Sequence, residues 1–147
     1  MKKIKVAING LGRIGRAFLR EVIRINTDEA RRMNTDTEIE VVAVNDLMPR
    51  ENAEYLLKYD SVYGQTRTHA DFTRTDAGES ALLFGGKRIR YFSEEEPAKL
   101  PWNELGVDVV VEATGFFASA AAAQAHLDAG AKRVVITAPI KEPTTNN

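Results

Sequence analysis

At 147 residues, the chain is long enough to form one domain with its own hydrophobic core. Its formal net charge of −1 argues against a broad electrostatic surface for nucleic acid or anionic membranes, and no apolar run reaches the roughly 18–20 residues that span a bilayer. The chain contains no cysteine, which excludes disulfides, thiolate metal sites and a cysteine nucleophile within these residues.

The first predicted element is a strand that ends at Gly10, because Ile4, Val6 and Ile8 alternate with basic or short residues. A basic start followed by apolar residues is also typical of a secretory signal. Here, however, the apolar part is only a few residues long, and no small-residue cleavage site follows it. We therefore interpret the segment as a buried strand and expect the protein to be cytoplasmic.

A helical period begins at about Arg13. Apolar residues at helical spacing predict one buried face, made of Ile14, Phe18, Val22 and Ile25. Three arginines predict a charged face beside it, made of Arg16, Arg20 and Arg24. The polar and charged residues 26–38 that follow are either an extension of this helix or a surface insertion.

The next apolar run, residues 39–45, is nearly continuous, as expected for a strand that is covered on both faces. Residues 49–59 then predict a short helix with Pro49 at its start. The side chains expected to turn inward from this helix are Ala53, Leu56 and Leu57.

The middle of the chain predicts an antiparallel patch attached to the main sheet. Strands are expected at residues 66–75, 80–84 and 87–92. The first two are separated by a turn at residues 76–78, and the last two by the two-residue hairpin signal Gly85-Gly86.

Regular alternation resumes near the end, with a buried strand at 107–111, an alanine-rich helix at 119–129 capped by Gly130, and a strand at 133–138. The order of elements predicts an α/β fold, namely a Rossmann-type doubly wound, mostly parallel sheet with an antiparallel strand insertion. Ligands of such sheets bind beyond the carboxyl ends of the strands, which makes those ends the expected site.

The two histidines, His69 and His126, lie far apart in the sequence, and neither has a metal-ligand neighbour at helical spacing. We therefore expect both side chains to be structural or solvated, and we predict no metal site. Membranes and nucleic acid are not expected as partners.

The first strand leads into Gly10-Leu11-Gly12-Arg13-Ile14-Gly15, a G-x-G-x-x-G between a strand and a helix. Gly10 permits the tight turn, Gly12 lets the backbone approach a pyrophosphate, and Gly15 lets the helix pack closely on the strand. The amides of Arg13 and Ile14, together with the helix dipole, would hold the phosphates. This arrangement predicts dinucleotide binding.

An acidic residue at the end of the second strand would accept hydrogen bonds from the adenosine ribose. Asp46 stands there, although residues 26–38 make the gap from the glycine motif longer than the usual ~20 residues. Its charge would repel a 2′-phosphate, so it favours NAD over NADP. Arg50 is the one nearby base that weakens this preference. The alternative is that Asp46 only caps the following turn.

Two further strand ends carry candidate contacts. Thr114 and Gly115 follow one strand and can face a cofactor, and an aromatic ring of Phe116 or Phe117 can stack near the adenine. Aromatic residues at such positions are more often part of the core, so this signal alone is weak. Thr137 ends the last strand, and its hydroxyl is equally ambiguous on its own.

Five segments, in this order, are similar to the glyceraldehyde-3-phosphate dehydrogenase family. They are residues 8–16 (INGLGRIGR), 42–47 (VAVNDL), 57–61 (LKYDS), 112–115 (EATG) and 130–139 (GAKRVVITAP). The resemblance extends over nearly the whole chain. It implies that residues 1–147 are the NAD-binding (Rossmann) domain of such a protein, with the catalytic domain absent from this chain.

The resemblance also implies roles for particular residues around the glycine loop. The amides of Arg13 and Ile14 would bind the pyrophosphate of NAD. Asp46 would bind the adenosine ribose, and Asn9 would help to shape the loop.

At the other strand ends, the resemblance implies that Thr114, Gly115 and Phe117 line the adenosine side of the cofactor. Thr137 would occupy a place near the nicotinamide that family members usually fill with serine or threonine.

Two segments depart from the family pattern. Residues 26–38 are longer than the usual connection, and we expect them to be a surface elaboration. Glu95 falls where many family members carry an arginine beside the adenine. The reversed charge puts that contact in doubt and would loosen adenine binding, unless only the backbone is used.

The implied activity is that of a glycolytic, phosphorylating NAD-dependent aldehyde dehydrogenase. In this family, a cysteine activated by a histidine attacks the aldehyde, hydride passes to the nicotinamide, and phosphate releases the acyl group. Family members carry that cysteine shortly beyond the last residue of this chain. We therefore predict no catalytic residue here, interpret the chain as truncated, and expect it to bind NAD without catalysis.

For the full-length protein, the resemblance implies a small aldehyde phosphate as substrate and a homotetramer as assembly. Two alternatives stay open. The chain could be a stand-alone NAD-binding module without catalysis, or the cofactor half of an erythrose-4-phosphate dehydrogenase, which shares this half.

Overall fold

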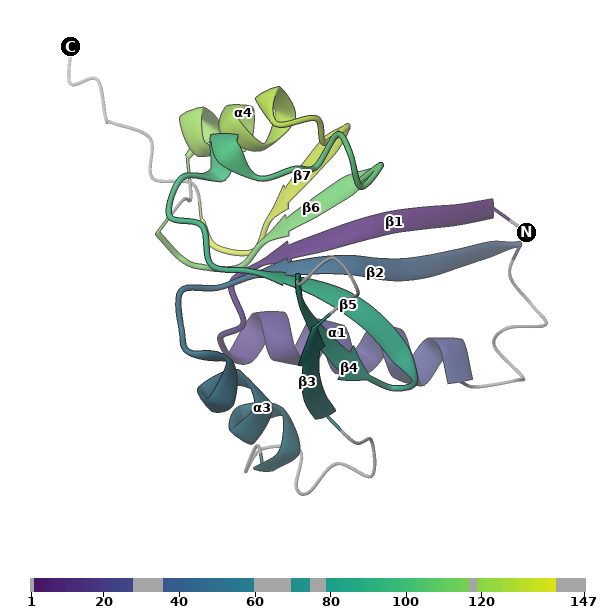
Figure 1. Ribbon diagram of the computed structural model, residues 1–147. Coiled ribbons are helices and arrows are strands. Elements are labelled where there is room, and N and C mark those ends of the chain that lie inside the picture. The colour runs from purple at the N-terminus through teal and green to yellow at the C-terminus, as the bar shows by residue number, and fades with distance from the viewer. Residues whose placement is uncertain (1, 28–35, 60–69, 75–78, 117–118, 140–147) are drawn as a thin grey trace, which may run out of the picture.

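The computed structural model describes residues 2–27, 36–59, 70–74, 79–116 and 119–139. Within them, seven strands form one sheet in the order β3-β4-β5-β2-β1-β6-β7 (Figure 1). The strands are β1 (Lys2–Asn9), β2 (Thr37–Asn45), β3 (Ala70–Arg74), β4 (Ser80–Phe84), β5 (Lys87–Phe92), β6 (Val109–Glu112) and β7 (Arg133–Ile136).

The pairings confirm the predicted mostly parallel sheet with an antiparallel insertion. β1 pairs in parallel with β2 and β6, β2 with β5, and β6 with β7. β4 pairs antiparallel with both β3 and β5, and Gly85 and Gly86, the predicted hairpin signal, make the β4–β5 turn with φ angles of 60° and 74°. The three strands β3, β4 and β5 therefore form the antiparallel part at one edge of the sheet, with β3 outermost.

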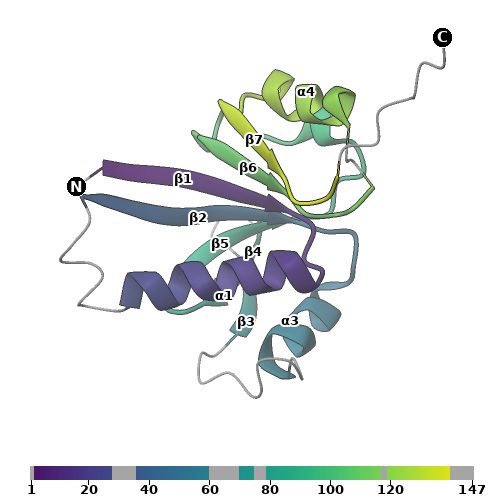
Figure 2. The same ribbon diagram turned by 180° about the vertical axis from the view of Figure 1, so that it is seen from behind.

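Helices cover both faces of the sheet, as predicted for a doubly wound fold. They are α1 (Arg13–Thr27), α3 (Arg50–Tyr59), α4 (Ala120–Asp128) and the short 3-10 helix η1 (Pro97–Lys99). The two opposite views show α1 and α3 on one side of the sheet and α4 on the other (Figures 1 and 2). None of the described helices is long and apolar enough to cross a membrane.

Neighbouring residues of the central strands point into two separate cores. Ile8 and Val44 pack with Leu19 of α1 in one hydrophobic cluster, whereas Ala7 and Ala43 pack in a second cluster on the α4 side. This alternation follows from the period of two in a strand. It explains why the carboxyl halves of β1 and β2 are apolar at successive positions and are buried.

The buried face of α1 differs from the predicted one. Val22 is buried as predicted, and Phe18 packs against the same core, but Ile14 is 54% exposed. The other buried positions on this side are Gly15 and Leu19. Gly15 fixes this rotation, because a Cβ there would overlap the carbonyl oxygen of Gly10. The helix therefore contacts β1 through its glycine, and Ile14 is turned outward.

The predicted charged face of α1 also needs correction. Arg16 is only 7% exposed, and its guanidinium donates a hydrogen bond to the carbonyl oxygen of Leu11 (2.9 Å). Arg20 reaches α3 and donates to the carbonyl oxygens of Leu56 (3.2 Å) and Leu57 (2.6 Å). Arg16 thus holds the backbone of the glycine loop, and Arg20 holds the backbone near the end of α3. Neither side chain belongs to a solvated face.

The segment 26–38 is helical at its start, because α1 continues to Thr27, and it becomes a strand at Thr37. Asn26 donates a hydrogen bond to the carbonyl oxygen of Ile39 (2.8 Å), which joins the end of α1 to β2. Residues 28–35 lie outside the described part of the chain, as do His69 and the predicted turn at 76–78.

Candidate functional site

The glycine loop connects β1 to α1 at the carboxyl ends of the strands (Figure 1). Gly10 has a φ of +102°, and a Cβ there would lie 2.8 Å from the backbone nitrogen of Thr114. Its own amide donates to the carbonyl oxygen of Asn45 (2.8 Å). The loop is therefore pressed between the ends of β2 and β6, and only glycine satisfies both the dihedral angle and the space.

Gly12 is different, because a Cβ built there meets nothing within 4 Å and its φ is not positive. The first hydrogen bond of α1 joins the Arg16 amide to the Gly12 carbonyl oxygen (2.9 Å). The amides of Arg13 and Ile14 precede that bond and have no partner within the helix. Open space in front of two helix N-terminal amides is the arrangement that binds phosphate.

Asp46 follows β2 and is held by two backbone amides. Its Oδ2 accepts from the amide of Leu11 (2.6 Å), and its Oδ1 accepts from the amide of Met48 (2.8 Å). The second bond is the turn cap considered above as the alternative role of Asp46. The first bond joins the carboxylate directly to the glycine loop, and both oxygens keep lone pairs for further donors.

A cleft of about 370 Å³ opens between these elements. Of the sequence-predicted site residues, those that line it are Asn9, Gly10, Gly12, Asp46 and Thr114. Arg13, Ile14 and Gly15 lie at the start of α1 beside it. Phe117 lies outside the described residues.

Sequence reasoning missed part of the lining. The residues that it did not name as site residues are Asn45, Leu47, Met48 and Glu94. Phe116 and Glu95, which it considered near the adenine, line the cleft as well. Leu47 is 61% exposed and Phe116 is 90% exposed, so both present apolar surface to the cleft rather than to a core. The motif positions gave no signal for Leu47 or Met48, which merely follow Asp46 in a loop.

The end of β6 is organised by Glu112, a buried carboxylate with 2% exposure. Its Oε1 accepts from the Thr114 hydroxyl (2.7 Å) and amide (3.1 Å), and its Oε2 accepts from Asn9 Nδ2 (2.7 Å). The Glu112 carbonyl oxygen accepts from the amide and hydroxyl of Thr137, both at 3.1 Å. Thr114 and Thr137 thus both bond Glu112, at the ends of neighbouring strands, while Gly115 continues the loop with a φ of +77°.

His126 of α4 is fully buried and contacts Glu112, with 2.6 Å between His126 Nε2 and Glu112 Oε2. The other ring nitrogen, Nδ1, accepts from the indole of Trp102 (3.0 Å). The expectation that His126 is structural is confirmed. Burial opposes ionisation of Glu112, but the hydrogen bonds from His126, Thr114 and Asn9 outweigh it and lower the pKa of this carboxyl.

Asn9 and Asn45 extend this set of contacts toward the other side of the cleft. Asn45 Nδ2 donates to Asn9 Oδ1 (2.8 Å), and the same amide group pairs with the backbone of Glu94 in both directions, accepting from its amide (2.8 Å) and donating to its carbonyl oxygen (3.0 Å). Both asparagines are buried. Their side chains join the ends of β1, β2 and β5.

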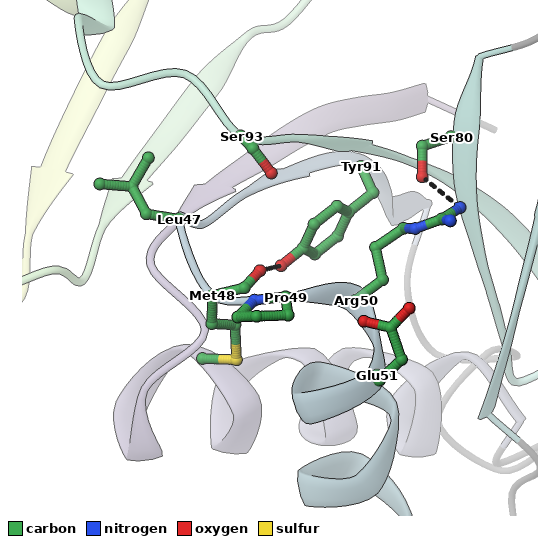
Figure 3. A pocket seen from close by; sticks show the side chains of 8 residues that line it. All are labelled: Leu47, Met48, Pro49, Arg50, Glu51, Ser80, Tyr91 and Ser93. Carbon is green, nitrogen blue, oxygen red and sulfur yellow. Dashed lines mark hydrogen bonds between the residues drawn. The ribbon is translucent and has the colours of Figure 1, made fainter.

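A second hollow, of about 560 Å³, adjoins the cleft, and Leu47 and Met48 border both. In it, the Tyr91 hydroxyl donates to the Met48 carbonyl oxygen (2.9 Å), and Arg50 extends to the Ser80 hydroxyl (3.3 Å; Figure 3). Burial, followed by the nearby Asp46 carboxylate, raises the pKa of Tyr91. The Arg50 side chain, which is bonded to Ser80, points toward β4 and away from Leu47 (Figure 3).

Fold and site together define the class: a Rossmann-type domain with a glycine loop before a helix and a carboxylate at the end of the second strand. The family described as "Glyceraldehyde 3-phosphate dehydrogenase, NAD binding domain" matches residues 4–120, and the chain belongs to this family. Among the described residues, no group of three His, Asp or Glu side chains is arranged to hold a metal ion.

Individual relatives agree with this assignment. The chain is 45% identical over 143 residues to glyceraldehyde-3-phosphate dehydrogenase 1 of Trichormus variabilis, and 47% identical over 137 residues to the Thermotoga maritima protein. It is 45% identical over 141 residues to the cytosolic protein of Trypanosoma brucei brucei. These alignments cover 97%, 93% and 96% of the chain but only 37%, 37% and 38% of the relatives. The chain thus spans little more than a third of their length.

Proposed function

We propose that this chain binds NAD, with the pyrophosphate on the glycine loop and the adenosine in the 370 Å³ cleft. The observation that carries the proposal is the free space at Gly12 in front of the Arg13 and Ile14 amides. The residues present fit the cofactor, because apolar side chains and polar groups from the strand ends line one cleft, beside the N-terminus of α1. Asn9, Gly10 and Gly15 shape the loop, and Thr114 and Gly115 line the adenosine side.

The proposed preference is for NAD over NADP. Asp46 would accept hydrogen bonds from the ribose hydroxyls, and its charge would oppose a 2′-phosphate. The position of Arg50 supports this preference, since its guanidinium is engaged with Ser80 in the neighbouring hollow. At the other end of the cofactor, Thr137 would lie near the nicotinamide, and Phe117 would complete the adenine site.

The reaction proposed for the whole protein is the phosphorylating oxidation of glyceraldehyde 3-phosphate, which transfers hydride to NAD. The names of the relatives, which are glyceraldehyde-3-phosphate dehydrogenases, favour this aldehyde over erythrose 4-phosphate. In this proposal, the 147 residues supply NAD binding. They contain no cysteine, so the thiol that attacks the aldehyde would come from residues outside them. A homotetramer in the cytoplasm belongs to the same proposal, in keeping with the cytosolic relative.

Titration calorimetry of the 147-residue chain with NAD and NADP tests the proposal. We expect NAD to bind, and Asp46→Ala to weaken NAD about tenfold or more and NADP much less. Loss of the bonds to Leu11 and Met48 affects both cofactors alike, so the NAD/NADP ratio isolates the ribose contact, which is worth about 1.5–3 kcal/mol.

Asp108→Ala is the matched control, because this carboxylate also bonds a backbone amide, that of Lys5 (2.9 Å), but at the opposite end of β6. It should leave both affinities unchanged. Equal losses of NAD and NADP affinity in Asp46→Ala would remove Asp46 from the ribose site. A wild-type chain that does not bind NAD would overturn the proposal itself.

A further inference from the structure

Glu112 accepts several hydrogen bonds, although the proposed function gives it no role. Four donor atoms converge on its two carboxylate oxygens, from Thr114, Asn9 and His126. The side chain is 2% exposed. The carboxylate therefore acts entirely within the protein, behind the surface of the cleft.

The direction of the hydrogen bonds on the α4 side is fixed by Trp102. An indole nitrogen can only donate, so Nδ1 of His126 must be the acceptor. The ring is then neutral, with its proton on Nε2, and it donates to Glu112 Oε2. On this side, the chain of bonds runs from Trp102 through His126 toward Glu112.

The direction on the other side is fixed by a backbone amide. The Glu94 amide donates to Asn45 Oδ1, so the Asn45 side-chain nitrogen faces Asn9 Oδ1. The Asn9 nitrogen is then the atom that donates to Glu112 Oε2. Here too the bonds run toward Glu112, starting from a group that can only donate.

A chain of hydrogen bonds with a donor at each end needs one member that accepts from both sides. Glu112 is that member, and an ionised carboxylate meets the requirement because both of its oxygens only accept. A glutamine in its place would turn an NH₂ group either toward Asn9 and His126 or toward the Thr114 amide. One buried donor would then face another donor, which is costly away from water.

The residues joined in this way each stand beside a proposed cofactor contact. Asn9 precedes Gly10, Asn45 precedes Asp46, and Thr114 lines the cleft. We propose that Glu112 is the positioning residue of the cofactor site, since its buried carboxylate sets the spacing between the ends of β1, β2 and β6. This inference rests on the proposed NAD binding.

The test compares Glu112→Gln with Asp108→Asn in the 147-residue chain. Both replace a hydrogen-bonded carboxylate by its amide, one at each end of β6. NAD affinity is measured by calorimetry at a temperature at which circular dichroism shows each variant fully folded. We expect Glu112→Gln to bind NAD at least about tenfold more weakly, and Asp108→Asn to bind as wild type does.

A purely structural Glu112 gives a different result. It would lower the melting temperature of Glu112→Gln and leave the NAD dissociation constant of the folded variant unchanged, and that outcome overturns the inference alone. If the wild-type chain itself does not bind NAD, the proposed function is refuted and the inference with it.

Trp102→Phe keeps the test decisive if Glu112→Gln does not fold. It removes the hydrogen-bond donor to His126 Nδ1 and leaves the carboxylate in place. We expect NAD binding about threefold weaker and a ¹⁵N chemical shift of His126 Nδ1 that shows the loss of its donor, while Glu112 keeps the proton on Nε2. Unchanged NAD affinity in folded Trp102→Phe, together with that change at Nδ1, would overturn the inference that these bonds position the cleft.

Discussion

The substitution Gly12→Ala is expected to weaken NAD binding without lowering the stability of the chain. In the structure, the new methyl group would contact nothing within 4 Å, and the φ of Gly12 is not in the left-handed region. Alanine therefore fits the free chain without strain. Since it restricts the unfolded chain more than glycine does, we expect stability to stay the same or to rise by about 0.4–1 kcal/mol.

The effect on NAD follows from the same open space. A phosphate held by the Arg13 and Ile14 amides would occupy the volume in front of Gly12, so the methyl group must push it away from at least one of them. A hydrogen bond to a charged group is worth about 1.5–3 kcal/mol. NAD binding should therefore weaken by roughly ten- to a hundredfold.

Calorimetric titration with NAD and a urea unfolding curve together measure both quantities. Gly86→Ala serves as the reverse control, because that position is equally open but has a φ of +74° in the β4–β5 turn, far from the cleft. It should lose stability and keep its NAD affinity. If Gly12→Ala binds NAD as wild type does, the pyrophosphate does not lie on this loop.

Two further outcomes follow from the glycine loop and from the buried carboxylate. Gly15→Ala should destabilise the chain by about 3 kcal/mol in chemical denaturation, because the added Cβ would overlap the Gly10 carbonyl oxygen; an unfolding curve like that of wild type would contradict the packing described here. The depressed pKa of Glu112 makes its contribution to stability complete above the unfolded value of about 4.3, and that contribution is lost as the pH falls through the lower folded value. The stability gap between wild type and Glu112→Gln should thus be constant from neutral pH to about 5 and shrink below it; a gap that widens on acidification would refute the assignment.

Much of the fold could be predicted because local patterns and the tertiary structure agree. The paired glycines at 85 and 86, the alanine-rich helix and the near-continuous apolar strands each point to the element that forms. The apolar period alone did not predict the rotation of α1, although the expected close approach of Gly15 to the strand agrees with it. Apolar residues with a period of 3.6 are compatible with more than one buried face of the same helix. The contact between Gly15 and Gly10 decides which face is buried.

The candidate site, like the fold, could be predicted only in part. The glycine motif and Asp46 are local signals, and the structure brings them together through the bond from the Leu11 amide. The contacts around Glu112 could not be found from local patterns, since Asn9 is 103 residues away from it in the sequence. Arg16 shows the same limit, because an arginine at helical spacing gives no sign that it will turn inward to hold a carbonyl group.

Trp102 is the only tryptophan of the chain, and it is fully buried with its indole nitrogen bonded to His126. Its intrinsic fluorescence therefore originates from a single environment, one hydrogen-bonded ring away from Glu112. The emission of this one indole reports on the ends of the central strands from inside the α4-side core, and no extrinsic label is needed to follow them in solution.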